Sequence, residues 1–190
     1  MIKRLHHIFL LIVSQLRPAF PVLLLMLASA NAGAQYSRSR EYNIKAVFLY
    51  NFTQFVEWPE TAFPTPGSPF VIGIVGDDPF RTAIDAIVTG EKVKEHPIVV
   101  QRFATLKEVD NCHIIFVSGP EAESYAKSGS ELRNKSILTV SDAPGFAKMG
   151  GMIRLVMQEN KIKLQINPTV AKAAQLSISS KLLRLAEIVE

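Results

Sequence analysis

The 190-residue sequence has a single cysteine, Cys112, and only two of its four histidines, His96 and His113, lie beyond the first seven residues. One cysteine cannot form a disulfide within the chain, and it cannot supply a thiolate cluster for a metal ion. Disordered and low-complexity chains are also excluded, because they lack apolar residues and this sequence is 48% hydrophobic. The length fits one globular domain, or at most two small ones.

Acidic residues are absent from the first 34 positions, which begin with basic residues and end with small ones. Apolar runs occupy 8–13 and 19–30. A basic start, an apolar middle and a small-residue end are typical of a secretory signal peptide. The alternative is a retained membrane anchor. Against it, Arg17 and two prolines interrupt the apolar stretch, whose longer run of about 12 residues is short of the roughly 20 in a spanning helix. We expect residues 1–34 to be cleaved.

The excess of basic residues belongs mainly to that segment. Without residues 1–34, Lys+Arg falls from 21 to 18 against 17 Asp+Glu, so the formal charge of the mature chain is about +1. A nearly neutral chain lacks the electrostatic footprint of a nucleic-acid-binding protein. We therefore predict no nucleic-acid partner.

Helix-like and strand-like segments alternate along the mature chain. Apolar residues recur at helical spacing over 41–57, and Trp58-Pro59 is expected to end this helix. Helices are also expected from Pro79 to about Val88 and from Gly119-Pro120 to about Arg133. Short apolar runs between them predict strands at Phe70–Val75, Ile98–Phe103, Cys112–Val117 and Ile137–Val140. This alternation predicts a mostly parallel sheet flanked by helices.

The last third of the chain does not continue this alternation of helices and strands. Two strand-like runs, Met152–Met157 and Ile162–Ile166, are separated by a short link and predict an antiparallel hairpin. Asn167-Pro168 begins a helix, and Ser179 or Ser180 begins another that we expect to reach Val189. The predicted fold is one α/β domain over 41–189, with a mostly parallel sheet and a C-terminal antiparallel hairpin.

Two glycine-containing segments are candidates for ligand-binding loops. Gly73-Ile74-Val75-Gly76 does not match G-x-G-x-x-G, and the following Asp77 and Asp78 would repel a phosphate. We interpret it as a tight turn, with Asp78 as the N-cap of the helix that begins at Pro79. Three further glycines are interpreted as turn residues, with a small-ligand loop as the alternative: Gly145, Gly150 and Gly151.

Cys112 and His113 are the only adjacent cysteine and histidine. Neighbouring residues of a strand point to opposite faces, so the two cannot form a catalytic pair with each other. We expect a buried, unreactive thiol. Two alternatives stay open for Cys112: an intermolecular disulfide, which would make it a redox thiol, and a role in catalysis or metal binding.

Four carboxylates lie nearest the expected strand ends: Asp77, Asp78, Asp85 and Asp142. A pair of them could serve acid–base chemistry, but isolated acids at turns are commonly caps. The G-x-S-x-G motif of serine hydrolases is also absent from the sequence. We therefore predict no enzyme and no cofactor, catalytic or metal site. The alternative is an enzyme that uses Asp77, Asp78 or His113.

Four residues are candidates for contacting a protein partner. Trp58 and Phe63 lie at the loop end of the aromatic helix, and exposed aromatic residues dominate interface hot spots. Lys181 and Arg184 are added for their charge and their position on the predicted last helix. The part of that helix not packed on the sheet is expected to meet a partner or a second copy of the chain, so a homodimer is possible.

Six short blocks, taken in order, resemble the YfiR-like family of small periplasmic regulators. They span nearly all of the mature chain: Tyr50-Asn51-Phe52-x-x-Phe55-x-x-Trp58-Pro59, Gly76-Asp77-Asp78-Pro79-Phe80, Cys112-His113-Ile114-Ile115-Phe116, Gly145-Phe146-x-x-x-Gly150-Gly151-Met152-Ile153, Ile166-Asn167 and Ser179-Ser180-x-Leu182-Leu183-x-Leu185. Each block alone is weak, but six in order are specific.

The resemblance implies a periplasmic α/β protein with no catalytic activity of its own. Such a protein binds the periplasmic domain of an inner-membrane diguanylate cyclase and inhibits it, which lowers cyclic di-GMP and biofilm formation. A peptidoglycan-associated outer-membrane lipoprotein can sequester the repressor. Cys112 matches a family cysteine, but its disulfide partner is missing from Phe70–Val75 and from Gly150-Gly151-Met152, so disulfide sensing is not implied here. The alternative function is a small-ligand sensor with its crevice near Gly76 and Asp142, at the carboxyl ends of the strands.

Overall fold

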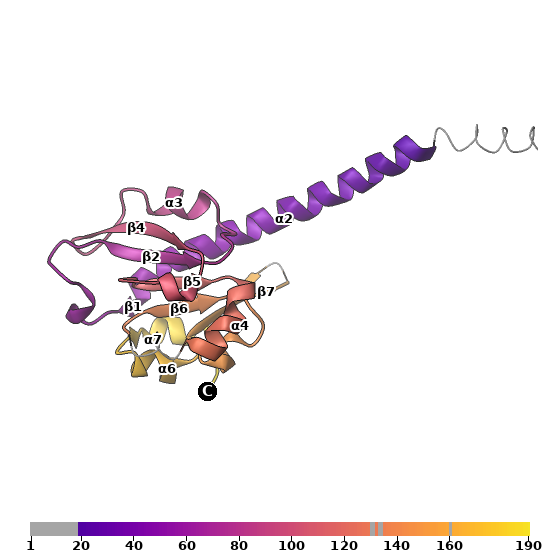
Figure 1. Ribbon diagram of the computed structural model, residues 1–190. Helices are drawn as coiled ribbons and strands as arrows, with labels where there is room; N and C mark the ends of the chain where they lie inside the picture. The colour runs from indigo at the N-terminus through magenta and orange to yellow at the C-terminus, as the bar shows by residue number, and fades with distance from the viewer. Residues whose placement is uncertain (1–18, 130–131, 133–134, 160) are drawn as a thin grey trace, which may run out of the picture. The chain divides into compact units, whose positions relative to one another are not determined.

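The computed structural model describes residues 19–129, 132, 135–159 and 161–190 (Figure 1). Contacts within the chain define two units, one ending at Arg40 and one spanning Glu41–Glu190. Residues 1–18, which include the basic start of the predicted signal peptide, lie outside the described residues, so cleavage of that segment stays a prediction. None of the helices in the described ranges combines the length and the apolar character needed to cross a membrane.

An eight-stranded sheet forms the centre of the second unit. Neighbouring strands are parallel except for two antiparallel pairs, β3 with β4 and β7 with β8. Across the sheet the order is β10 (Ala186–Ile188), β8 (Lys161–Ile166), β7 (Ile153–Gln158), β6 (Leu138–Ser141), β5 (Ile114–Val117), β2 (Phe70–Val75), β4 (His96–Phe103) and β3 (Lys92–Val93). The predicted α/β domain, with its mostly parallel sheet and its C-terminal hairpin, is confirmed.

Both faces of the sheet are covered where β2 runs. Its side chains alternate between two core clusters, with Ile72 and Ile74 in one and Val71 and Val75 in the other. The first cluster includes residues of α2, α3 (Ala83–Val88), α6 (Pro168–Ala173) and α7 (Ser180–Leu183). The second includes residues of α4 (Gly119–Ser128) and of the 3-10 turns η2 (Leu106–Glu108) and η3 (Phe146–Met149). A strand buried on both faces is a continuous apolar run, which explains why Phe70–Val75 was predicted with its observed bounds.

The helix α2 (Ala19–Phe55) begins earlier than the predicted helix and ends two residues sooner. Within the second unit it buries Ala46, Leu49 and Phe52 completely, whereas Ile44 and Val47 stay exposed. After Phe55 the chain is extended as β1 (Val56–Glu57), which pairs antiparallel with β9 (Ser177–Ile178). This ladder joins the end of α2 to the chain just before α7.

The helix predicted to begin at Pro79 begins instead at Ala83, after a turn. Asp78 accepts hydrogen bonds from the backbone N–H groups of Phe80 and Arg81, at 2.8 and 3.1 Å, so it caps the turn and not the helix. Arg81 has a φ of 53°, which is outside the helical range. This left-handed residue separates the capped turn from α3 and explains the late start.

The last predicted helix is wrong over half its length. Helix α7 ends at Leu183, and Ala186–Ile188 forms β10, which lies parallel to β8. The backbone N–H of Val189 donates to the carbonyl of Ile166 at 2.9 Å. Hydrogen bonds to the free edge of β8 favour a strand here, and the short apolar run alone does not distinguish the two structures.

Candidate functional site

Two of the predicted partner-binding residues belong to a histidine–aromatic cluster, formed by Trp58, Phe63, Phe70, His96 and His113. The Phe63 ring stacks on the rings of His96 and His113, with centroid distances of 3.9 and 4.6 Å. The indole N–H of Trp58 donates to the carbonyl of His113 at 3.0 Å, and its ring meets Phe70 edge-on. Trp58 and Phe63 are therefore half-buried and held in place by internal contacts.

His113 is a neutral, structural imidazole in this cluster. It is 2% exposed, and its Nδ1 accepts the backbone N–H of Val71 at 3.0 Å. Burial lowers the pKa of His113 to about 4. An imidazole that already accepts a main-chain hydrogen bond and is shielded from water is a poor general base, which argues against the alternative of an enzyme that uses His113.

Cys112 lies on the opposite side of the sheet from the ring of His113, as predicted from strand geometry. It is 5% exposed within the core cluster that includes Ile115. Its Sγ lies 3.4 Å from the carbonyl of Asp110 and would lie 3.0 Å from a Cβ added at Gly73. Burial, with the charge of Asp110, raises the pKa of the Cys112 thiol to about 12. The thiol is therefore protonated at neutral pH, and thiolate chemistry is disfavoured.

The carboxyl end of β2 turns at Gly76, which packs closely against Ser118. Its φ of 81° is a conformation that favours glycine, and an added Cβ would lie 2.3 Å from Ser118 Oγ. The interpretation as a tight turn is confirmed. Glycines 145 and 150 also have positive φ values and flank η3, while a Cβ at Gly151 would lie 2.2 Å from the ring of Phe146. These positions are used for turns and close packing.

Asp142 takes part in an internal ion pair. Lys45, which is only 2% exposed, places its Nζ 2.5 Å from Asp142 and 2.5 Å from Glu41. The hydroxyl of Tyr42 donates to Asp142 at 2.8 Å. The carboxylate expected to line a ligand crevice is therefore already bound by a lysine and a tyrosine of α2. This arrangement argues against the small-ligand sensor.

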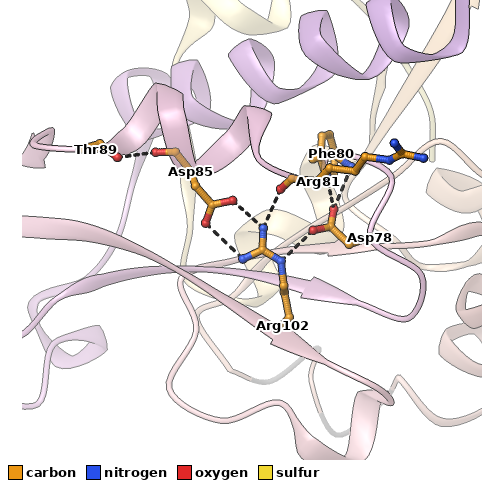
Figure 2. Close-up of polar contacts among 6 residues, drawn as sticks. All are labelled: Asp78, Phe80, Arg81, Asp85, Thr89 and Arg102. Atoms are coloured by element: carbon orange, nitrogen blue, oxygen red, sulfur yellow. Dashed lines mark hydrogen bonds and ion pairs between the residues drawn. The ribbon is translucent and has the colours of Figure 1, made fainter. Parts of the chain in front are cut away.

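Asp78 and Asp85 are engaged by Arg102 of β4 (Figure 2). The guanidinium binds Asp85 with two hydrogen bonds and Asp78 with one at 2.7 Å, and it also donates to the carbonyl of Arg81. These bonds lower the pKa of Asp85 and raise that of Arg102. The cluster fixes the turn after β2 against β4. Within the described ranges, no three His, Cys, Asp or Glu side chains meet as a possible metal site.

The other two predicted partner-binding residues are exposed. Lys181 belongs to α7 and Arg184 follows it as its C-cap. The neighbouring Leu185 is 77% exposed. Because β1 and β9 are antiparallel, Trp58 leaves this ladder at the Glu57 end and α7 leaves it at the other end. The four predicted residues thus belong to two separate groups, one half-buried and one exposed.

Sequence reasoning did not anticipate three of these arrangements: the stacking of both histidines on Phe63, the pairing of Lys45 with Asp142, and the Arg102 cluster. Lys45 and Asp142 are 97 positions apart, and Tyr50 reaches Glu91 across 41 positions. Such pairs depend on where the helix crosses the sheet. The spacing of residues in a single sequence does not predict which helix residues will face which strands.

The fold and these contacts define an α/β domain in which Asp78, Asp85 and Asp142 form internal ion pairs. The YfiR/HmsC-like family profile matches residues 42–187, and the chain belongs to this family. The resemblance inferred from the six sequence blocks is confirmed. The family is periplasmic and regulatory, and it is associated with control of a membrane diguanylate cyclase. The search of curated proteins found no matching relative.

Proposed function

We propose that this protein is a periplasmic repressor that binds the periplasmic domain of an inner-membrane diguanylate cyclase and holds the enzyme inactive. The family match across 42–187 carries this proposal. The internal pairing of Asp78, Asp85 and Asp142 supports a binding role over a catalytic one. Repression lowers cyclic di-GMP and, with it, biofilm formation. Sequestration by a peptidoglycan-associated outer-membrane lipoprotein relieves the repression.

The mechanism is a population shift. The repressor binds the inactive state of the cyclase's periplasmic domain more tightly than the active state, and the difference in affinity sets the inhibition. Turning a cyclase that is about 99% active into one that is about 1% active requires a preference of roughly 10⁴-fold. A family member without an active site can exert such control through contacts alone.

The exposed group, Lys181 and Arg184 beside Leu185, is the accessible part of the proposed contact surface. Trp58 and Phe63 are half-buried, so they contribute their exposed edges and hold the segment 58–63 against the sheet. Arginine and aromatic residues are enriched at interface hot spots. The proposed role of these four residues rests on residue type and exposure.

The test is the cyclic di-GMP level in cells that lack the gene and carry a plasmid copy. Wild-type protein is expected to lower cyclic di-GMP, and Lys181→Glu/Arg184→Glu is expected to lose part of this effect. The matched control is Lys107→Glu/Lys127→Glu, which makes the same change in charge on exposed residues of η2 and α4. If deletion leaves cyclic di-GMP unchanged, the repressor function is wrong. If both double variants repress normally, only the proposed contact residues are wrong.

A further inference from the structure

The chain between β1 and β2, residues 58–69, forms a strap that is docked by few contacts. None of its residues is fully buried, and its main-chain hydrogen bonds close turns within the strap. Two side chains dock it: the Trp58 indole donates to the carbonyl of His113, and the Phe63 ring stacks on His96 and His113. A segment with few buried contacts opens locally at a lower free energy than the whole domain.

The imidazole of His113 keeps its place only while it is uncharged. Its Nδ1 accepts the N–H of Val71 at 3.0 Å, so the ring hydrogen of the neutral form is on Nε2. Nε2 is buried and has no hydrogen-bond partner among the described residues. Protonation puts a second hydrogen on Nδ1, which then faces the Val71 N–H, and it creates a buried charge. The charged ring therefore has to turn towards water, past the Phe63 ring that stacks on it.

The groups that act on His113 are its burial, His96 and the main chain of Ala62. Burial lowers the pKa of His113 to about 4, which the main chain of Ala62 opposes and His96 reinforces. The segments around His113 also carry charged side chains, all of them exposed: Glu57, Glu60, Lys94, Glu95, Asp110 and Lys135. Of these, Asp110 and Lys135 act on the Cys112 thiol, on the opposite side of the sheet.

His96 does not impose the same constraint. Its Nδ1 lies 2.6 Å from the carbonyl of Ser68 in the strap. A ring nitrogen that faces a carbonyl carries a hydrogen whether the imidazole is neutral or charged, so this bond survives protonation. Of the two histidines that stack on Phe63, only His113 has to lose a hydrogen bond when it is protonated.

We propose that protonation of His113 releases the strap from the sheet, which makes residues 58–69 a pH-sensitive switch. The charged imidazole loses the Val71 N–H and displaces the Phe63 ring, and the Trp58 indole then loses its carbonyl partner. Trp58 and Phe63 are candidate partner contacts, so release removes them from their fixed positions. The weaker repression expected in acid rests on the proposed function, whereas the release itself does not.

Proton linkage gives the size of the effect. In the open state His113 faces water and has the ordinary pKa of 6.5, against about 4 in the closed state. The open state therefore binds more protons between these two values, and the equilibrium constant for opening rises as the pH falls. Between pH 7.5 and pH 5 this constant is expected to rise about 30-fold.

The test is hydrogen exchange of the mature protein followed by NMR at pH 7.5 and pH 5, corrected for the intrinsic exchange rate at each pH. Trp58 is the only tryptophan of the chain, so its indole N–H gives a single signal. The protection of this N–H and of the Val71 amide is expected to fall about 30-fold at pH 5. Both are expected to stay less protected than the amide of Phe116 in the central strand β5.

Two asparagine variants separate the histidines. His113→Asn still offers an acceptor to the Val71 N–H but does not titrate, so it is expected to lose the pH dependence. His96→Asn is the matched control, because its amide can still donate to the carbonyl of Ser68, and it is expected to keep the pH dependence.

A third variant covers the case in which His113→Asn fails to fold. Phe63→Ala removes a half-buried ring that stacks on His113, so it is expected to lower the protection of the Trp58 indole at pH 7.5 and to reduce its pH dependence. Thr65→Ala, at an exposed position of the same strap, should behave as the wild type.

Three results would overturn the proposal. They are protection of the Trp58 indole that does not change with pH, protection equal to that of Phe116, and a pH dependence that is undiminished in folded His113→Asn or in Phe63→Ala. Release in acid without any loss of cyclic di-GMP repression would overturn only the link to the proposed function.

Discussion

At the residue scale, three buried side chains with titratable groups are held in unreactive states: His113, Cys112 and Lys45. His113 is neutral and accepts the N–H of Val71, while the Cys112 thiol is protonated in the core. Lys45 is buried but lies between Glu41 and Asp142. An unpaired charge at such a depth would cost several kcal/mol, so these partners are part of the stability of the fold.

Stability is expected to depend on pH through His113. Its pKa is about 4 in the folded state against an ordinary value of 6.5, so the unfolded state binds more protons between these values. Stability is therefore complete above pH 6.5 and falls as the pH drops to about 4, by on the order of 3 kcal/mol. Urea unfolding at pH 7, 6, 5 and 4 measures this slope.

The control for that slope is His113→Asn. Its side-chain oxygen can still accept the N–H of Val71, but the amide does not titrate. The variant is expected to be less stable at pH 7 and to lose most of the slope between pH 6.5 and 4. Equal slopes in the two proteins would show that His113 is not the responsible group.

Cys112 is expected to be unreactive in the native protein. Because burial keeps the thiol protonated and shielded, a thiol reagent such as DTNB should label it slowly at pH 8 and rapidly in 6 M guanidinium. Reducing and non-reducing gels of periplasmic extract should look the same. Stoichiometric labelling of the native protein within minutes, or a dimer band that is lost in Cys112→Ser, would establish a redox role.

At the element scale, connections between strands are fixed by side chains far apart in the sequence. Arg102 on β4 ties down the turn between β2 and α3, and the β1–β9 ladder ties the end of α2 to the start of α7. Figure 2 shows the guanidinium between the two carboxylates. The turn with left-handed Arg81 is thereby held in one conformation.

Arg102→Gln is expected to loosen this turn. The side chain is 41% exposed, so solvent screening limits the loss of stability to about 1 kcal/mol despite the paired hydrogen bonds. Hydrogen exchange in 76–83 should speed up more than in β5, and added salt should reduce the difference from wild type. Lys107→Gln, which also removes an exposed positive charge, should change stability by less than about 0.5 kcal/mol. Equal effects of the two substitutions would contradict the account.

The strands were more predictable than the elements at the ends of the sheet. Phe70–Val75 is apolar throughout because it is buried on both faces, so its sequence carries a strong signal. The sequence of 180–189 carries only a weak signal. Its second half forms a strand because it pairs with the free edge of β8. The α3 start was misplaced because nothing local reports the left-handed Arg81. Of the candidate site, the burial of Cys112 could be predicted from the sequence, but the half-burial of Trp58 and Phe63 could not.

At the scale of the whole molecule, the described domain is a nearly neutral α/β module with a covered central sheet. Its family relation extends from 42 to 187. Carboxylates near the carboxyl ends of the strands are engaged internally, as Asp142 with Lys45 and Asp78 with Arg102 show. The proposed regulation by contact with another protein agrees with the internal use of these carboxylates.

The most direct test of the repressor function is a pull-down from solubilised membranes with the mature, tagged protein, followed by identification of what it retains. The account predicts recovery of a membrane protein with a periplasmic domain and a cytoplasmic diguanylate cyclase domain. Purified cyclase activity should fall when the protein is added back. Recovery of no cyclase, or of a cyclase whose activity is unchanged by the bound protein, would contradict the proposed function.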